Sequence, residues 1–115
     1  MNLQQSNYYH IEIYNNQLPL AQLVWLEGDG NYTRIHIQKA WPVMTPKTLT
    51  RWQEQLPTFI RVSKGALINP LHIADIMDLS SKELWIILTD GTKLSVPRRR
   101  VALLRHYLEK MIKPS

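Results

Sequence analysis

The chain has 115 residues, enough for one domain with one core, and its 44% hydrophobic and 20% charged residues are an ordinary globular balance. The absence of cysteine excludes disulfides and cysteine-ligated zinc, and no apolar run approaches the roughly 18 residues that span a membrane. The first residues lack the basic and apolar segments of a secretory signal, so we expect a cytoplasmic protein with no membrane partner. The formal net charge of the chain is +5.

The first 17 residues are expected to form an N-terminal extension to a main domain at residues 18–115. Residues 1–8 have no pattern and are interpreted as a loose leader. The alternation of Ile11 and Ile13 with polar neighbours predicts a short strand at residues 10–14. Asparagines and a glutamine at residues 15–17 then predict a turn.

A hairpin is predicted next. The apolar run at residues 20–26 is typical of a strand that is buried on both faces. Two glycines and two short polar residues at 28–31 favour a tight loop, and the alternation at 32–37 predicts the returning strand. A further strand is expected at residues 41–44.

An internal helix follows this strand. Thr45 is expected to cap it, with Pro46 at the first helical position. Pro57 is expected to end it, because proline cannot continue a helix. The apolar stripe of this helix consists of Leu49, Trp52 and Leu56.

The rest of the chain alternates short apolar segments with polar breaks. Asp90 and Gly91 tolerate positive φ and predict a hairpin turn, and a final helix is expected from Pro97 onward. Strands are expected at residues 59–62, 67–68, 73–79, 84–89 and 93–96. The apolar face of the final helix would consist of Val101, Leu104, Leu108 and Met111. Strands that follow one another directly predict a mainly β fold of antiparallel sheets with one short internal helix and a C-terminal helix.

The positive charge is concentrated near the C-terminus. Residues 92–115 contain seven basic residues and one acidic residue, so this segment carries a net charge of +6. Such a field favours a polyanionic partner, and a solvated face on a terminal helix is an equally good explanation of the charge alone.

No pattern for catalysis or for a cofactor stands out. The glycines at 28 and 30 lack the third glycine of a dinucleotide loop, and no acidic pair stands out as an acid/base couple. The four histidines are scattered and have no metal-site spacing; they are His10, His36, His72 and His106. We therefore expect no enzyme activity, no metal, no cofactor and no small-molecule substrate.

The tryptophans bear on the kind of nucleic acid that the basic segment would bind. Trp25, Trp52 and Trp85 lie in apolar patterns and are expected in the core. Trp41 lies beside a loop, so the sequence does not decide whether it is buried. Stacking of single-stranded bases on aromatic rings is therefore a weaker explanation of the charge than duplex binding.

Three segments carry a resemblance to a known family. They are LVWLEGDGNYTRIHI at residues 23–37, TLTRWQEQLPTFIRVSKGALINPLHI at 48–73 and LTDGTKLSVPRRRVALL at 88–104. In this order and spacing they resemble the LytTR DNA-binding domain of bacterial transcription regulators. Two positions depart from its usual pattern: Ser63-Lys64-Gly65 stands where the family usually has a histidine, a basic or polar residue and a serine, and Pro97 stands where it usually has serine.

The resemblance implies an elongated set of antiparallel sheets whose loops enter successive major grooves, and hence sequence-specific binding of double-stranded DNA. The base-reading residues carried over from the matching positions are Asn31, Lys64 and Arg99. The expected phosphate contacts are Arg98, Arg61, Ser63, Arg100 and Lys47. Simpler roles stay open: Asn31 as a turn cap, Arg61 as the partner of an acidic residue, and Arg100 as a solvated side chain.

Other readings of the same scaffold remain. A protein- or RNA-binding module that has lost base readout is the main alternative, motivated by the two departures. A repeated DNA site would bring two copies of the chain together as a dimer. Family members are often fused to a receiver domain, and we expect none in this chain, which would be a free-standing regulator or a part of a longer one.

Overall fold

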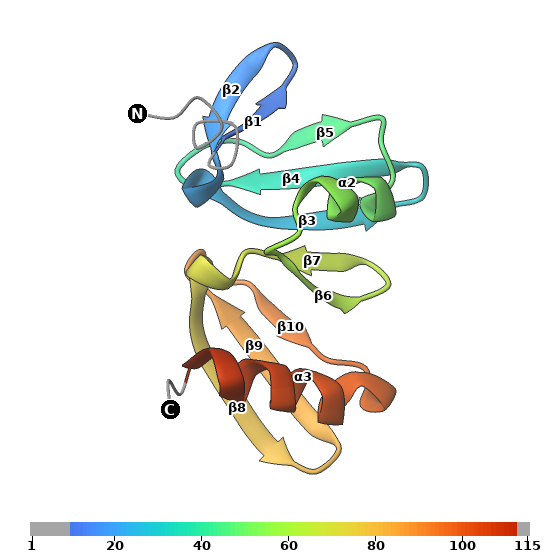
Figure 1. The fold of residues 1–115 in the computed structure, drawn as a ribbon, viewed down its shortest axis with the longest axis vertical. Coiled ribbons are helices and arrows are strands. Elements are labelled where there is room, and N and C mark those ends of the chain that lie inside the picture. The colour runs from blue at the N-terminus through green and yellow to red at the C-terminus, as the bar shows by residue number, and fades with distance from the viewer. Residues whose placement is uncertain (1–9, 113–115) are drawn as a thin grey trace.

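The structure, a computed structural model, describes residues 10–112, so the leader expected at residues 1–8 lies outside the described residues. Figure 1 shows three antiparallel sheets of two, five and three strands in this part of the chain. The strands are β1 (His10–Ile13), β2 (Asn16–Pro19), β3 (Leu23–Asp29), β4 (Tyr32–Ile37), β5 (Val43–Thr45), β6 (Ile60–Ser63), β7 (Ala66–Ile68), β8 (Ile73–Ser80), β9 (Glu83–Leu88) and β10 (Lys93–Ser95). The α-helices are α2 (Leu49–Gln55) and α3 (Arg98–Ile112), and the 3-10 helices are η1 (Leu20–Gln22) and η2 (Pro70–His72).

The five-stranded sheet, in the order β5-β4-β3-β7-β6, is the central layer. Leu23 and Leu26 of β3 pack in one apolar cluster with α2 and β1, whereas Val24 and Trp25 pack in a second cluster with α3 and the three-stranded sheet β10-β9-β8. Successive side chains of a strand normally point to opposite faces, and a register shift between Leu23 and Trp25 lets the neighbours Val24 and Trp25 pack in the same cluster. This explains why β3 is apolar without alternation, and it confirms the prediction of a strand buried on both faces.

The predicted class is confirmed: the fold is mainly β, all strand pairs are antiparallel, and one short internal helix and one C-terminal helix complete it. The molecule measures 43 × 36 × 25 Å along its principal axes. The two α-helices cover opposite faces of the five-stranded sheet, because their buried residues belong to different apolar clusters, and β6 and β7 lie between them in the view of Figure 1.

The turn predicted at residues 15–17 begins one residue earlier and is shorter than expected. Tyr14 and Asn15 form the turn, with φ of 49° and 66°, and Asn16 already pairs with Ile13 as the first residue of β2. Positive φ at two successive positions matches the right-handed twist of a hairpin, and asparagine tolerates it well. The division between residues 17 and 18 stays a prediction, although β2 crosses it.

The helix cap was also predicted at the wrong threonine. Thr45 ends β5, and Thr48 is the cap, since its hydroxyl accepts a 3.3 Å hydrogen bond from the Arg51 N–H. A residue before proline prefers extended backbone, so Thr45 ahead of Pro46 stays in the strand. The predicted end holds, because α2 stops at Gln55 ahead of Pro57.

Trp85 was expected in the core, and that expectation is wrong. Its side chain is half-buried, because Leu84 and Ile86 take the inner face of the three-stranded sheet and leave Trp85 on the outer one. Trp25 and Trp52 are buried as predicted, at 7% and 3% exposure. On α3, the predicted stripe is buried except for its last residue, Met111, which is 41% exposed near the helix end.

The strand predicted at residues 20–26 begins only at Leu23, because η1 precedes it. Asn69 holds this junction: its buried amide donates to the carbonyls of Leu20 and Leu23 at 3.0 and 2.8 Å, and its oxygen accepts from the Leu71 N–H at 3.0 Å. One side chain therefore joins two segments that are about 46 residues apart in sequence.

Replacing Asn69 with alanine should lower the free energy of unfolding by about 2–3 kcal/mol, because the backbone groups of Leu20, Leu23 and Leu71 lose the side-chain partner that Asn69 provides. Urea unfolding of both proteins measures this difference. Asn16→Ala is the control, since Asn16 is exposed and makes one 3.4 Å bond to the Tyr14 carbonyl. Equal stability of the Asn69→Ala variant and the parent would contradict the role assigned to this amide.

Candidate nucleic-acid interface

Three polar connections lie along one edge of the molecule, on the right in Figure 1: the β3–β4 turn, the β6–β7 turn and the start of α3. Hydrogen bonds join them in pairs. The Gly28 N–H donates to the Gly65 carbonyl at 2.9 Å, and Nη2 of Arg100 donates to the Arg61 carbonyl at 2.8 Å. The predicted sites, scattered in sequence, are thus brought to one edge.

The β3–β4 turn consists of Gly30 and Asn31 between the paired residues Asp29 and Tyr32. Gly30 has a φ of +61°, which suits the first central position of a type II′ hairpin turn and favours glycine there. Asn31 is exposed, and its side chain makes no hydrogen bond within residues 10–112. The amide is therefore presented outward, and a turn-capping role has no support from its contacts.

The β6–β7 turn presents Lys64 on a backbone that is braced from inside. Arg61 donates from Nε to the Ser63 carbonyl, from Nη2 to the Lys64 carbonyl and from Nη1 to Gln53 Oε1, each at 2.7 Å. The Gly65 N–H also donates to Ser63 Oγ at 3.3 Å. Lys64 is exposed and has no partner among the described side chains, so its amine is free to meet a ligand.

Arg61 does not pair with an acidic residue in the described part of the chain. Burial lowers the pKa of Arg61, and the positive charge of Arg100 lowers it further. Two guanidinium groups are thus held near each other at the junction of β6 and α3. As phosphate contacts, Arg61 and Arg100 stay predictions, since some of their donors are already used within the fold.

Arg98 and Arg99 occupy the first turn of α3, and both are exposed. The first turn contains no acidic residue. Cations at a helix N-terminus oppose the helix dipole by typically 0.3–1 kcal/mol each. Helix stability therefore does not explain why two arginines lie at this helix end. Binding of an external anion would explain it.

Lys47 lies in the connection from β5 to α2. Its Nζ sits 4.1 Å from the centre of the Trp52 ring, and its carbonyl accepts from Thr33 Oγ1 at 2.6 Å. The amine is thus guided by a cation–π contact and is half-buried. Its contact with phosphate stays a prediction, as does that of Ser63.

The sequence did not predict that residues at the start of α2 belong to this candidate interface. A cavity of about 400 Å³ opens between the two turns and is lined by Gly28, Gly30, Thr48, Leu49, Thr50, Arg61, Lys64 and Gly65. Thr50 is exposed there, and its hydroxyl adds a neutral hydrogen-bonding group beside Lys64. The three threonines in residues 45–50 were the available signal.

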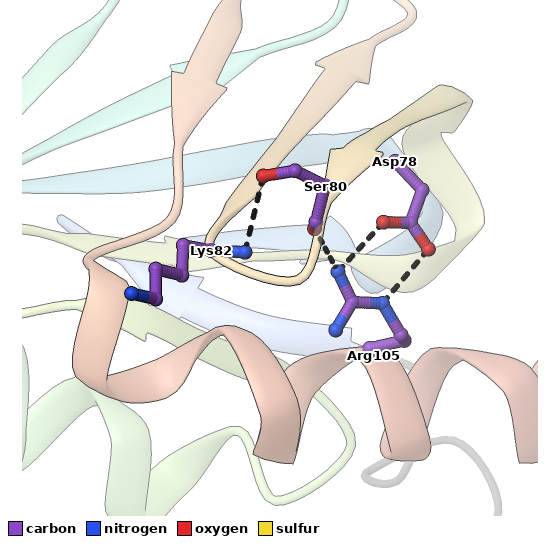
Figure 2. A network of polar contacts seen from close by, with 4 residues as sticks. All are labelled: Asp78, Ser80, Lys82 and Arg105. Carbon is purple, nitrogen blue, oxygen red and sulfur yellow. Dashed lines mark hydrogen bonds and ion pairs between the residues drawn. The ribbon is translucent and has the colours of Figure 1, made fainter.

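Arg105, farther along α3, is engaged inside the fold. Figure 2 shows its guanidinium against Asp78 of β8, with bonds of 2.8 Å from Nε and 2.7 Å from Nη2, and against the carbonyl of Ser80. The hydrogen bond with Arg105 holds the pKa of Asp78 below its usual value, and the same bond raises the pKa of Arg105. Arg105 therefore joins α3 to the β8–β9 hairpin by hydrogen bonds, whereas Arg98 and Arg99 have no such partner in the described part of the chain.

The Asp78–Arg105 pair should make stability depend on acid. Because the hydrogen bond with Arg105 lowers the folded pKa of Asp78 below its ordinary value near 3.8, the pair contributes fully above that value and is lost as pH falls through the folded pKa. The parent should therefore have a higher melting temperature than Asp78→Asn at pH 6, and the difference should shrink as the pH falls below 3.8 and through the lowered pKa of Asp78. A gap that stays constant from pH 6 to pH 2.5 would show that the carboxylate charge plays no part.

Within residues 10–112, no cluster of three or more potential metal ligands occurs. None of the helices described is long and apolar enough to cross a membrane.

The sequence profile of the family described as LytTr DNA-binding domain matches residues 15–109. Among solved structures, the fold is similar to the LytTr DNA-binding domain of a Bacillus cereus protein described as a methyl-accepting/DNA response regulator, with a TM-score of 0.68. The two chains are 17% identical, and the match covers 86% of this chain and 94% of the other. No curated protein matches the chain.

Proposed function

Because the chain belongs to the LytTr DNA-binding domain family, we propose that it binds double-stranded DNA in a sequence-specific way and regulates transcription. The turns on the shared edge enter successive major grooves from one side of the duplex. Enzymatic activity is no part of this proposal, and the protein acts in the cytoplasm, where bacterial chromosomal DNA lies.

The dimensions of the molecule support this docking. One turn of B-DNA rises about 34 Å, and the longest axis of the molecule, along which the turns are spread in Figure 1, measures 43 Å. The molecule as a whole is therefore long enough to cover about one helical turn of the duplex, and the β6–β7 turn lies between the β3–β4 turn and the start of α3.

The exposed groups suit base readout. Arg99 can donate two hydrogen bonds to O6 and N7 of guanine, Lys64 can reach the same edge, and the Asn31 amide can pair with N6 and N7 of adenine. We assign these three residues to bases because each side chain is free of partners in the described structure.

Phosphate contacts fix the register of the protein on the duplex. We assign Arg98 to this role because it is exposed in the first helical turn, where positive charge is otherwise unfavourable. Lys47, Ser63, Arg61 and Arg100 are further candidates, and the last two are the least free because they also hold the β6–β7 turn and the start of α3 together.

The observation that carries the proposal is the convergence of three unneutralised cations, Lys64, Arg98 and Arg99, on one edge. Exposed cations without acidic partners do not stabilise the core, and they attract a polyanion such as DNA. Two copies on a repeated site would form a dimer on DNA, although no surface for a dimer is assigned.

Selection of duplexes from a random library tests the proposal. An enriched motif with two contacted segments about one helical turn apart is expected, and random DNA should bind with a log–log salt slope of about −3 to −4 if four phosphates are neutralised. Weak, salt-independent binding with no enriched motif would refute base readout and favour a protein-binding module. Enrichment from single-stranded RNA and not from duplex would favour an RNA-binding one.

A further inference from the structure

A second cavity, of about 220 Å³, lies between α2 and α3 beside β6. Its polar lining consists of Gln53, Arg61 and Arg100, which are joined by hydrogen bonds of 2.7 and 2.8 Å. Its apolar lining consists of Phe59, Ile60, Leu103, Leu104 and Tyr107. The cavity therefore combines cationic and apolar surface in one place.

The charge at the polar part is not neutralised from within the fold. Among residues 10–112, neither Arg61 nor Arg100 forms an ion pair with an acidic side chain. The Nε of Arg100 is buried and has no hydrogen-bond partner there. Since nothing in the described part of the chain neutralises this guanidinium, an anion in the cavity would supply a charged acceptor for Arg100 that the fold itself does not provide.

The apolar part is open to solvent on the α3 side. Leu103 and Tyr107 are 63% and 46% exposed and lie one helical turn apart on the same face, where no described segment covers them. Phe59 and Leu104 form the floor and belong to the buried core. An engineered apolar cavity of about 150 Å³ is large enough to bind benzene, so the present one can take a ring or a short chain.

We propose that this cavity binds a small organic carboxylate with an apolar tail. The carboxylate accepts from the guanidinium of Arg100, for which planar two-oxygen anions are the best match. The tail covers Leu103 and Tyr107. A DNA phosphate supplies the anion and no tail, so the apolar lining distinguishes this ligand from the duplex. The proposal goes beyond DNA binding and does not depend on it.

The test uses the full chain without DNA and 3-phenylpropanoate as the probe, followed by calorimetry and by NMR of the arginine Nε–H groups. Saturable binding with a shift at Arg100 is expected. Acetate, which lacks the tail, and 3-phenylpropan-1-ol, which lacks the charge, should each bind at least about tenfold more weakly. Equal binding of acetate would show a nonspecific anion site, and equal binding of the alcohol would show an apolar hole; either overturns the proposal, as does the absence of saturation.

Variants locate the site. Arg100→Gln should weaken the probe at least about tenfold, whereas Arg51→Gln, which removes the same charge from the exposed face of α2, should change it less than twofold. Leu103→Asp places a negative charge beside the tail and should also weaken binding about tenfold; since Leu103 is exposed, this variant folds even if Arg100→Gln does not. Equal losses with Arg51→Gln, or unchanged binding with Leu103→Asp, would contradict the site.

Discussion

Replacing Lys64 and Arg99 together with alanine should weaken binding to the cognate duplex by about 2–6 kcal/mol, which is the sum of 1–3 kcal/mol for each base contact. The two side chains lie on separate elements, the β6–β7 turn and α3, and neither has a partner in the described structure. Each single variant should also relax the preference at one base pair. Titration of the cognate duplex and of single-base variants measures both effects.

The control removes a cation from the other edge. Lys39 lies in the β4–β5 connection, on the left in Figure 1, and Lys39→Gln should leave affinity within about twofold. If the Lys64 and Arg99 variants lose as much affinity for random duplex as for the cognate site, the two residues contact phosphates and do not read bases.

Replacing Trp52 with alanine should lower the free energy of unfolding by about 3–5 kcal/mol, the usual cost of removing a buried tryptophan. Trp52 is 3% exposed, packs α2 on the five-stranded sheet and donates from Nε1 to Thr45 Oγ1 at 2.9 Å. Because a domain of this size has a total stability of about 5–15 kcal/mol, the variant should be partly unfolded at moderate temperature. Denaturant unfolding followed by circular dichroism measures the loss.

Trp52→Phe separates packing from polar contacts. It keeps an aromatic ring in the core and removes the bond to Thr45 and part of the attraction for the Lys47 amine. We expect a loss of about 1–2 kcal/mol. Trp41→Phe is the matched control, because Trp41 is 89% exposed and should change stability by less than about 0.5 kcal/mol. A Trp52→Ala loss no larger than that of the control would contradict the packing described.

Local sequence patterns predicted most of the elements correctly. The alternation at Ile11 and Ile13, the glycine turn before Tyr32 and the apolar stripe of α2 all mark structure that depends on near neighbours. The errors fell where distant residues decide the outcome. Thr45 could cap a helix by itself, but its hydroxyl is bonded to the Thr33 carbonyl across the sheet and to Trp52. Trp85 is apolar enough for the core, but the register of β9 turns it outward.

For the candidate site, the residue types were predictable and their partners were not. The cations at positions 64, 98 and 99 were visible in the sequence. The three bonds of Arg61 to the β6–β7 turn and to Gln53 depend on how α2 packs beside β6, which no local pattern reveals. The same is true of Arg100, whose bond to the Arg61 carbonyl spans 39 positions.

Periodicity, turn chemistry and charge along the chain were enough to determine a β-rich scaffold with cations at its polar breaks, because these properties depend on side chains a few residues apart. Which arginines serve the fold and which face outward was decided only by packing between segments far apart in sequence. Whether the outward group meets a duplex depends on Lys64, Arg98 and Arg99 sharing one edge, and sheet order sets that arrangement.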